Sequence, residues 1–214
     1  MPVFHICGGG HLDRHLHLEG EVVLGRTNPA AQRIEIGGVA ANIARHLAAR
    51  GGDVRFTGVQ PPAEIEMMAA RLRAAGVEAS LLPLEGEAPG YTAVVAADGE
   101  LLVGAASMSL YDAVAPDMLT GQIATGSGPL VIDANFPEPV LQVICAAQPE
   151  ARLLFAAATS VAKTARLMGC LARLDGIVLN SSEAAVLAGQ APVADMACAL
   201  AARIRPGGTV LVSD

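Results

Sequence analysis

The sequence predicts an α/β fold, in which helices cover both faces of a mainly parallel β-sheet and a small second β-sheet stands apart. Three observations support this prediction. From Pro116 onward, short strand-like segments alternate regularly with helix-like segments. These strand-like segments are apolar throughout, which is typical of strands buried on both faces. Residues 14–36 and 88–107 are extended stretches that no helix interrupts, so they are expected to form the small sheet together.

The first strand is expected at residues 3–7 and ends at Gly8-Gly9-Gly10. A glycine run after a first strand occurs in dinucleotide-binding proteins, but their motif also requires a helix directly behind the glycines. Here residues 14–19 alternate between polar and apolar side chains, which favours a strand. The dinucleotide motif is therefore rejected. Residues 22–24 and 33–36 are two further strand candidates.

A helix is expected over residues 39–50, because apolar side chains recur at helical spacing and a glycine pair follows. Residues 54–59 form the next predicted strand. A proline pair marks a break before a second helix that ends near residue 75. Residues 77–84 are extended again.

A β-hairpin is expected between residues 91 and 104. The strand-like runs 91–96 and 101–104 flank Ala97-Asp98-Gly99-Glu100. An Asp-Gly pair between two such runs is a strong hairpin signal, because these residues adopt the tight turn at little cost.

The alternation of the C-terminal half can be read segment by segment. The expected helices are residues 116–124, 138–147, 161–173, 182–189 and 194–204. The expected strands are residues 129–133, 152–156, 176–180 and 209–213. This order predicts a parallel sheet, because successive strands joined by helices run in the same direction.

The composition indicates a folded protein. Of 214 residues, 52% are apolar and the mean hydropathy is +0.45, which excludes a disordered chain. No stretch approaches the roughly 18 consecutive apolar residues that a membrane span needs. The N-terminus shows neither a basic region nor a cleavage signal. A cytoplasmic protein without membrane partners is therefore expected.

Charge and cysteine spacing exclude two further classes. The net charge is −7 and no basic patch is present, so nucleic acid is not an expected partner. The four cysteines lie far apart and form neither a CxxC pair nor a zinc-binding spacing. Free thiols in a reducing compartment are expected.

Candidate site residues follow the strands of the predicted sheet. In open α/β sheets, ligands bind beyond the carboxyl ends of the strands. The polar residues and glycines at those ends are Gly9, Gly10, Asp13, Asp133, Asn135, Thr159, Ser160, Asn180 and Glu183. A helix-cap role fits some of them, such as Ser160. Asp133 ends an apolar strand and is expected to face a crevice. Together the residues predict a ligand site.

A second candidate is the stretch Ile36-Gly37-Gly38-Val39-Ala40-Ala41-Asn42. Two adjacent glycines allow the backbone to approach a ligand closely. The helix that follows offers unpaired N–H groups in its first turn, and Asn42 falls in that turn. A tight turn with a solvated Asn42 is the alternative interpretation of this stretch.

These motifs, in this order, resemble the ribokinase (PfkB) family of carbohydrate kinases. The resemblance rests on Gly8-Gly9-Gly10 with Asp13, on Gly37 to Asn42, on Asp133-Ala134-Asn135 and on Asn180-Ser181-Ser182-Glu183. It covers essentially the whole chain. The stretches 160–163 and 174–180 are similar to pseudouridine-kinase-type members.

The resemblance implies a three-layer α/β/α fold with a small β-sheet lid. It also implies ATP- and Mg²⁺-dependent transfer of the γ-phosphoryl group to a hydroxyl of a ribose-like sugar or a nucleoside. Asp13, Gly37, Gly38 and Asn42 would hold the sugar, beside the crevice residues Asp133 and Asn135. The nucleotide would be held by three residues, Asn180, Glu183 and Lys163, and Glu183 would also order Mg²⁺. A homodimer formed through the lid is a further implication.

The sequence departs from the family in two places. Gln60-Pro61-Pro62 stand where the family usually has a Gly-Asp pair in the substrate pocket. The family's glycine-rich catalytic turn, with its aspartate base and anion hole, would lie beyond Asp214. No catalytic residue is therefore assigned, and the 214 residues are expected to be a C-terminally incomplete kinase without turnover. A non-catalytic sugar- or nucleoside-binding remnant is the alternative.

The sequence disfavours two other functions. A nucleotide-dependent oxidoreductase is disfavoured by the strand-like residues after Gly10. His11, His15 and His17 lie within seven residues, but neither a cysteine nor a second carboxylate is arranged around them. Solvated or lid-facing histidines are expected instead of a metal site.

Overall fold

A computed structural model describes residues 3–124 and 128–213; Asp214, which follows the last predicted strand, lies outside this range. The first half contains β1 (Phe4–Cys7), β2 (His11–Leu18), β3 (Ala30–Gly37), α1 (Val39–Ala49), β4 (Val54–Gln60), α2 (Ile65–Ala74), β5 (Glu78–Pro83), β6 (Gly90–Val95) and β7 (Leu101–Ser107). The second half contains α3 (Ser109–Asp112), α4 (Thr120–Ile123), β8 (Leu130–Asp133), α5 (Glu138–Ala146), β9 (Leu154–Ala157), α6 (Val161–Thr164), β10 (Gly176–Asn180), α7 (Ser181–Ala188), α8 (Val193–Ala201) and β11 (Thr209–Ser213). Two 3₁₀ helices cover Pro62–Glu64 and Ala165–Arg173.

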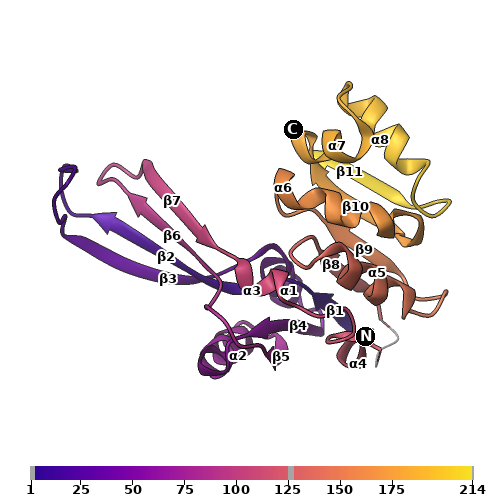
Figure 1. The fold of residues 1–214 in the computed structure, drawn as a ribbon, viewed down its shortest axis with the longest axis horizontal. Helices are drawn as coiled ribbons and strands as arrows, with labels where there is room; N and C mark the ends of the chain where they lie inside the picture. The colour runs from indigo at the N-terminus through magenta and orange to yellow at the C-terminus, as the bar shows by residue number, and fades with distance from the viewer. Residues whose placement is uncertain (1–2, 125–127, 214) are drawn as a thin grey trace.

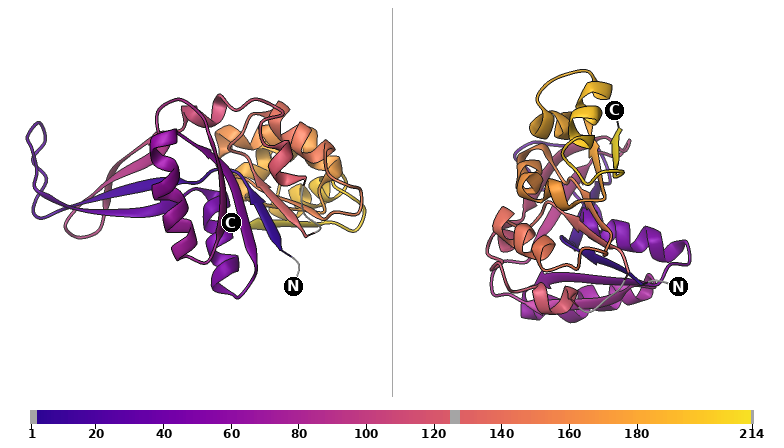
Figure 2. Two further views of the ribbon diagram at one scale, coloured as in Figure 1. Left: turned by 90° about the horizontal axis from the view of Figure 1, so that it is seen from below. Right: turned by 90° about the vertical axis from the view of Figure 1, so that its right-hand side faces the viewer.

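The strands form two sheets (Figure 1). The large sheet has seven parallel strands in the order β11-β10-β9-β8-β1-β4-β5. The small sheet has the order β3-β2-β6-β7 and mixes antiparallel and parallel pairs. Figure 2 shows this small sheet, called the lid below, projecting as an arm from the helix-covered body. The predicted parallel sheet with a separate small sheet is confirmed.

Two hydrophobic cores lie on opposite faces of the large sheet. On β1, Ile6 packs with residues of α1 and α2, whereas the next residue, Cys7, belongs to the core on the other face. Adjacent strand residues point to opposite faces, so the strand can feed both cores. The second core includes buried side chains of α5, α7 and α8, such as Leu141, Leu187 and Leu200. The result is a three-layer α/β/α arrangement, as predicted.

The lid contains the predicted hairpin. β6 and β7 pair antiparallel, and the backbone N–H of Ala96 donates to Glu100 O at 2.8 Å across the turn. The other two lid strands each start three residues before the expected position, β3 at Ala30 and β2 at His11. This earlier start brings His11 and Asp13 into the lid's first strand.

Three local predictions were wrong. Residues 22–24 form no strand, because the Asn28 side chain binds the backbone N–H and C=O of Val23 and so stabilises a loop. The predicted helix 116–124 is reduced to α4, which follows turns. The predicted helix 161–173 is split into α6 and a 3₁₀ helix. The last two segments contain Gly121 and Gly169, which weaken an α-helix.

No single helix within the described residues has the length and apolar content needed to cross a membrane. The bent pair α7 and α8 meets that test only when the two helices are counted together.

Candidate functional site

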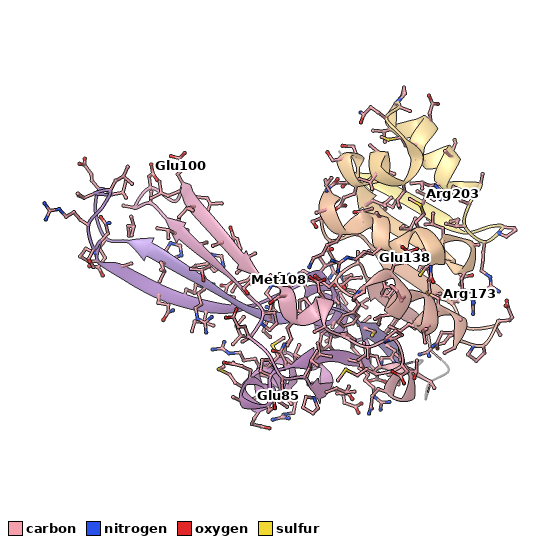
Figure 3. The ribbon with its side chains drawn as sticks, viewed as in Figure 1. Glu85, Glu100, Met108, Glu138, Arg173 and Arg203 are labelled. Carbon is pink, nitrogen blue, oxygen red and sulfur yellow. The ribbon has the colours of Figure 1, made fainter. Side chains whose placement is uncertain are left out.

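A cavity of about 410 Å³ lies between the lid and the carboxyl ends of the large sheet's strands. Figure 3 labels Met108, one of its lining residues, where β7 leads into α3. The lining residues come from both sheets and from α1 and α6: His11, Asp13, Gly38, Val39, Asn42, Tyr91, Ala106, Met108, Asn135, Thr159, Ser160 and Lys163. Seven predicted site residues therefore meet here, namely Asp13, Gly38, Asn42, Asn135, Thr159, Ser160 and Lys163.

Asp13 reaches the cavity from β2. Its Oδ1 lies 3.2 Å from Nε2 of His11, yet this buried oxygen accepts no hydrogen bond, because no N–H is directed at it. Gly37 on β3 does not line the cavity. A Cβ added at Gly37 would lie 2.2 Å from the Asp13 carboxylate, so glycine makes room for that carboxylate. Gly37 thus supports the site indirectly.

Gly38 starts α1 with a φ of 94°, which L side chains rarely adopt. A Cβ there would lie 2.4 Å from the carbonyl oxygen of Gly9. The first turn of α1 does not offer all its N–H groups to a ligand, contrary to the prediction. The N–H of Ala40 donates to Asp133 at 3.1 Å, and that of Ala41 donates to Gly9 O at 3.2 Å.

Replacing Gly38 with alanine is expected to lower the free energy of unfolding by roughly 2–4 kcal/mol, because unfavourable φ and contact with backbone add together. Gly51 provides a matched control, since its φ is 84° and nothing lies within 4 Å of its would-be Cβ. G51A is expected to cost only about 1 kcal/mol. Urea denaturation of both variants measures the difference, and equal losses would contradict the close approach of Gly38 to Gly9.

Asn42 is held in one orientation by its neighbour on α1. Nη1 of Arg45 donates to Oδ1 of Asn42 at 3.2 Å and to the carbonyl of Ile36 at 3.1 Å. Because the carboxamide oxygen is engaged by Arg45, its NH₂ group remains to donate into the cavity. Arg45 therefore makes Asn42 a hydrogen-bond donor toward a ligand.

Asp133 does not face the cavity as predicted; it is fully buried beneath it. Its carboxylate accepts four N–H bonds, from the backbone of Gly9, Ala40 and Asn135 and from Nδ2 of Asn135, at 2.8–3.2 Å. Burial raises the pKa of Asp133, and these four bonds oppose that shift because they stabilise the charged form. Asp133 thus joins β1, α1 and β8 and positions the cavity floor.

Asn135 and Lys163 form the opposite wall. Nζ of Lys163 donates to Oδ1 of Asn135 at 2.8 Å and lies 5.6 Å from the ring centroid of Tyr111. Burial, followed by the charge of Arg166, lowers the pKa of Lys163. A partly buried ammonium group at the edge of a cavity suits an anionic ligand group.

Thr159 completes the polar lining. Like Oδ1 of Asp13, its buried Oγ1 has no hydrogen-bond partner within the described residues. Buried polar atoms are rarely left unpaired, because each costs free energy. Two such oxygens at one cavity can accept hydrogen bonds from water or from a polar ligand.

Gln60 and Tyr111 fix the turn between β1 and β2 from below. The Gln60 amide and the Tyr111 hydroxyl both donate to the carbonyl of Gly10, the latter at 2.9 Å. Burial raises the pKa of Tyr111, whose hydroxyl oxygen also lies 3.2 Å from Nδ1 of His11. Gln60, the departure noted in the sequence, is therefore buried below the cavity and does not line it.

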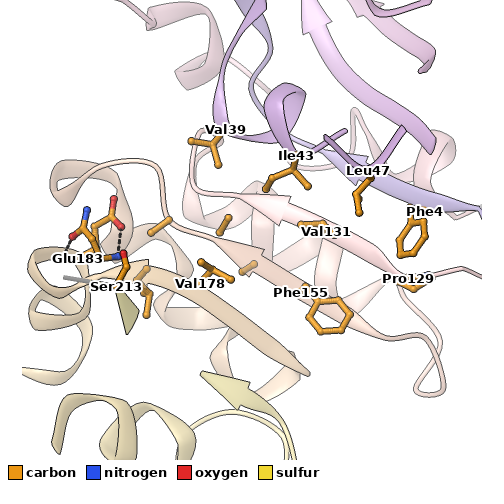
Figure 4. A pocket seen from close by; sticks show the side chains of 15 residues that line it. Phe4, Val39, Ile43, Leu47, Pro129, Val131, Phe155, Val178, Glu183 and Ser213 are labelled. Atoms are coloured by element: carbon orange, nitrogen blue, oxygen red, sulfur yellow. Dashed lines mark hydrogen bonds between the residues drawn. The ribbon is translucent and has the colours of Figure 1, made fainter. Parts of the chain in front are cut away.

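Asn180 and Glu183 lie in a neighbouring cavity of about 640 Å³ on the open face of the large sheet (Figure 4). They form a helix capping box: Glu183 N donates to Asn180 Oδ1 at 2.8 Å, and Asn180 N donates to Glu183 Oε2 at 2.9 Å. Val39 borders both cavities, so the two sites adjoin.

Few side chains in this region could bind a metal ion. No group of three or more His, Cys, Asp or Glu side chains converges within the part of the chain that the structure describes. Mg²⁺, however, retains several water molecules and is often held by one or two carboxylates together with substrate phosphates. Glu183 fits such a role, in which it is one of few protein ligands, because its Oε2 already accepts a hydrogen bond in the capping box.

Sequence reasoning missed three lining residues, Tyr91, Ala106 and Met108, and did not place His11 at the site. The chain has only two tyrosines, and both contact this region: Tyr91 lines the cavity and Tyr111 lies below it. The rarity of aromatic side chains was the available signal. Rarity alone does not show where a side chain points, because the strand register decides whether Tyr91 faces the cavity.

Comparisons with known proteins agree with this geometry. A family model described as pfkB family carbohydrate kinase matches residues 21–214. The structure of a carbohydrate kinase from Agrobacterium tumefaciens is 32% identical with a TM-score of 0.88, covering 100% of this chain and 71% of its own. An Arabidopsis thaliana ribokinase complexed with ribose and ATP is 17% identical with a TM-score of 0.76, covering 99% of this chain and 71% of its own.

A ribokinase from Cryptococcus neoformans in complex with ADP is 19% identical with a TM-score of 0.66, covering 94% of this chain and 67% of its own. The comparison with curated proteins gives no match.

Proposed function

The chain belongs to the pfkB family of carbohydrate kinases, and we propose that it serves ATP-dependent phosphoryl transfer to a hydroxyl of a ribose-like sugar or a pseudouridine-like nucleoside. The observation that carries this proposal is the pair of buried oxygens at one cavity that accept no hydrogen bond within the described residues, Asp13 Oδ1 and Thr159 Oγ1. A polyol supplies hydroxyl donors for both. The NH₂ group of Asn42 supplies the complementary donor to a sugar oxygen.

In this proposal the sugar lies between the lid and the large sheet. Asp13 accepts hydrogen bonds from two of its hydroxyl groups, and Asn42 donates to a third. Gly37 and Gly38 leave room for these contacts, and Asn135 closes the floor above Asp133. Kinases act mainly by positioning their substrates and by stabilising charge, so fixed contacts of this kind contribute directly to rate.

The nucleotide is proposed to occupy the adjoining cavity. Asn180 and Glu183 line that cavity, and Lys163, which lines the smaller cavity, is proposed to offer its ammonium group to phosphate oxygens. The Arabidopsis and Cryptococcus ribokinases of this fold are complexed with ATP and with ADP, which supports a nucleotide ligand. Mg²⁺, ordered by Glu183 through water, would neutralise charge on the phosphates.

We further propose that residues 1–214 alone bind the sugar without catalysing transfer. None of the described residues is assigned as the base that accepts the hydroxyl proton. On the open sheet face, Val178 and Leu211 pair in register and are 50% and 53% exposed, which favours additional polypeptide there. Losing a general base costs about 10²–10⁴-fold in rate.

Two assays of residues 1–214 test this proposal. A thermal-shift screen is expected to show stabilisation by ribose or a nucleoside and none by NAD. Sugar-dependent ADP formation is expected to stay at background, whereas clear turnover would overturn the proposed lack of activity. Stabilisation by NAD alone would favour an oxidoreductase and overturn the kinase proposal.

A homodimer formed through the lid is part of the same proposal. β7 is exposed along its whole length at the edge of the lid sheet, and such an edge favours pairing with another strand. The molar mass from light scattering tests this, and a monomer at all concentrations would contradict it.

A further inference from the structure

The cavity face of the lid extends outward beyond Asp13. On β6, Tyr91 is the direct register partner of Asp13, and on β2 His15 lies two residues further from the large sheet. Alternate strand residues share a face, so Asp13, His15, His17 and Tyr91 lie on the same side of the lid. Because Asp13 and Tyr91 line the cavity, this side is the one that faces it.

The aromatic rings on this face form a row. A Cβ added at Gly104 would lie 2.3 Å from the Tyr91 hydroxyl oxygen and 2.8 Å from Cε2, so the Tyr91 ring rests on the bare backbone of β7. His15 meets that ring at 70° with centroids 6.4 Å apart. His17 stacks on His15 at 24°, also with centroids 6.4 Å apart. The row therefore starts beside Asp13 and continues toward the lid tip.

We propose that Tyr91 and His15 form a subsite for a planar heteroaromatic ring attached to the sugar, so that the site prefers nucleosides to free sugars. The inference rests on the proposed function, in which Asp13 holds the sugar. Aromatic side chains bind nucleobases through their π-faces, whatever the base.

The spacing fits a ring joined to a ribose. Neighbouring strands lie about 4.8 Å apart, and residues two apart on a strand lie about 6.7 Å apart. Tyr91 is thus one strand from the carboxylate that holds the sugar, and His15 is one further step outward. A base attached to a ribose at Asp13 would therefore extend toward Tyr91 and His15.

The chemistry of the surrounding wall disfavours two other extensions. Val39, Ala106 and Met108 also line the cavity, and such apolar side chains cannot pair with the hydroxyl groups of a second sugar. A thioether such as that of Met108 makes favourable contacts with aromatic rings. A phosphate is disfavoured beside Tyr91, because among the described residues that line the cavity the one Lys or Arg is Lys163, which lies on the opposite wall.

Titration calorimetry of residues 1–214 with ribose and with uridine tests the subsite. The unchanged chain is expected to bind uridine about 5- to 30-fold more tightly than ribose. Y91A is expected to abolish this preference while ribose affinity changes less than about twofold, and Y91F is expected to retain it. T92A is the matched control, because Thr92 neighbours Tyr91 on β6 but points to the other lid face.

Each outcome is decisive. Equal affinity for ribose and uridine, or a preference that persists in Y91A, would overturn the subsite while leaving sugar binding intact. Equal weakening of both ligands by Y91A would assign Tyr91 a structural role only and would also overturn it. If the unchanged chain bound neither ligand, both the proposed function and the subsite would be contradicted. Thermal unfolding of Y91A and Y91F confirms that both variants are folded.

Discussion

Replacing Asp133 with asparagine is expected to lower the free energy of unfolding by about 3 kcal/mol or more. The Asp133 carboxylate is fully buried and accepts N–H bonds from Gly9, Ala40 and Asn135. Asparagine would present an NH₂ group to these donors, so at least one buried N–H group would lose its acceptor. For a chain of this size the loss corresponds to a decrease in Tm of about 6–12 °C.

Asp117→Asn is the matched control for this prediction. Asp117 is exposed, and its carboxylate makes no hydrogen bond or ion pair within the described residues. The same change of charge and shape is expected to alter the free energy of unfolding by less than about 0.5 kcal/mol there. Calorimetric unfolding of both variants provides the comparison. Equal Tm values for D133N and D117N would show that the network beneath the cavity contributes little.

Replacing Asp13 with asparagine is expected to weaken ribose binding roughly 10- to 100-fold, because hydrogen bonds to a charged group contribute about 1.5–3 kcal/mol. Stability should change little, since Asp13 Oδ1 accepts no hydrogen bond in the protein alone. This combination distinguishes a ligand-binding role from a structural one: D133N should mainly lose stability, whereas D13N should mainly lose affinity.

Glu35→Gln is the matched control for D13N. Glu35 is the direct register partner of Asp13 on β3, so the same change is made on the adjacent strand of the lid. It does not line the cavity between the lid and the large sheet. Ribose affinity is therefore expected to change less than twofold in E35Q, apart from any small effect of net charge.

The parallel sheet could be predicted because its signals are local. The uniformly apolar strands and the helices between them appear in sequence order, and β8, β9 and β10 were each placed within two residues of their observed bounds. The wrong strand prediction for residues 22–24 also has a local cause. Their apolar side chains resemble a strand, but the Asn28 side chain binds Val23 and holds a loop.

The positions of Asp133 and Tyr91 could not be predicted from local patterns. Asp133 ends a strand and was expected to face the crevice, but β8 pairs with β1, far away in sequence. There the Cβ-free backbones of Gly8 and Gly9 leave space that Asp133 and Asn135 fill. Tyr91 faces the cavity only because of the register between β2 and β6. Both placements depend on strand pairing.

The most direct test of the sugar site is calorimetric titration of ribose into the unchanged chain, D13N and E35Q under identical conditions. Saturable binding to the unchanged chain and to E35Q with similar affinity is expected, and binding at least about tenfold weaker to D13N. Equal affinities for D13N and the unchanged chain, or no binding to any of the three, would contradict the assignment of the cavity beside Asp13 as the sugar site.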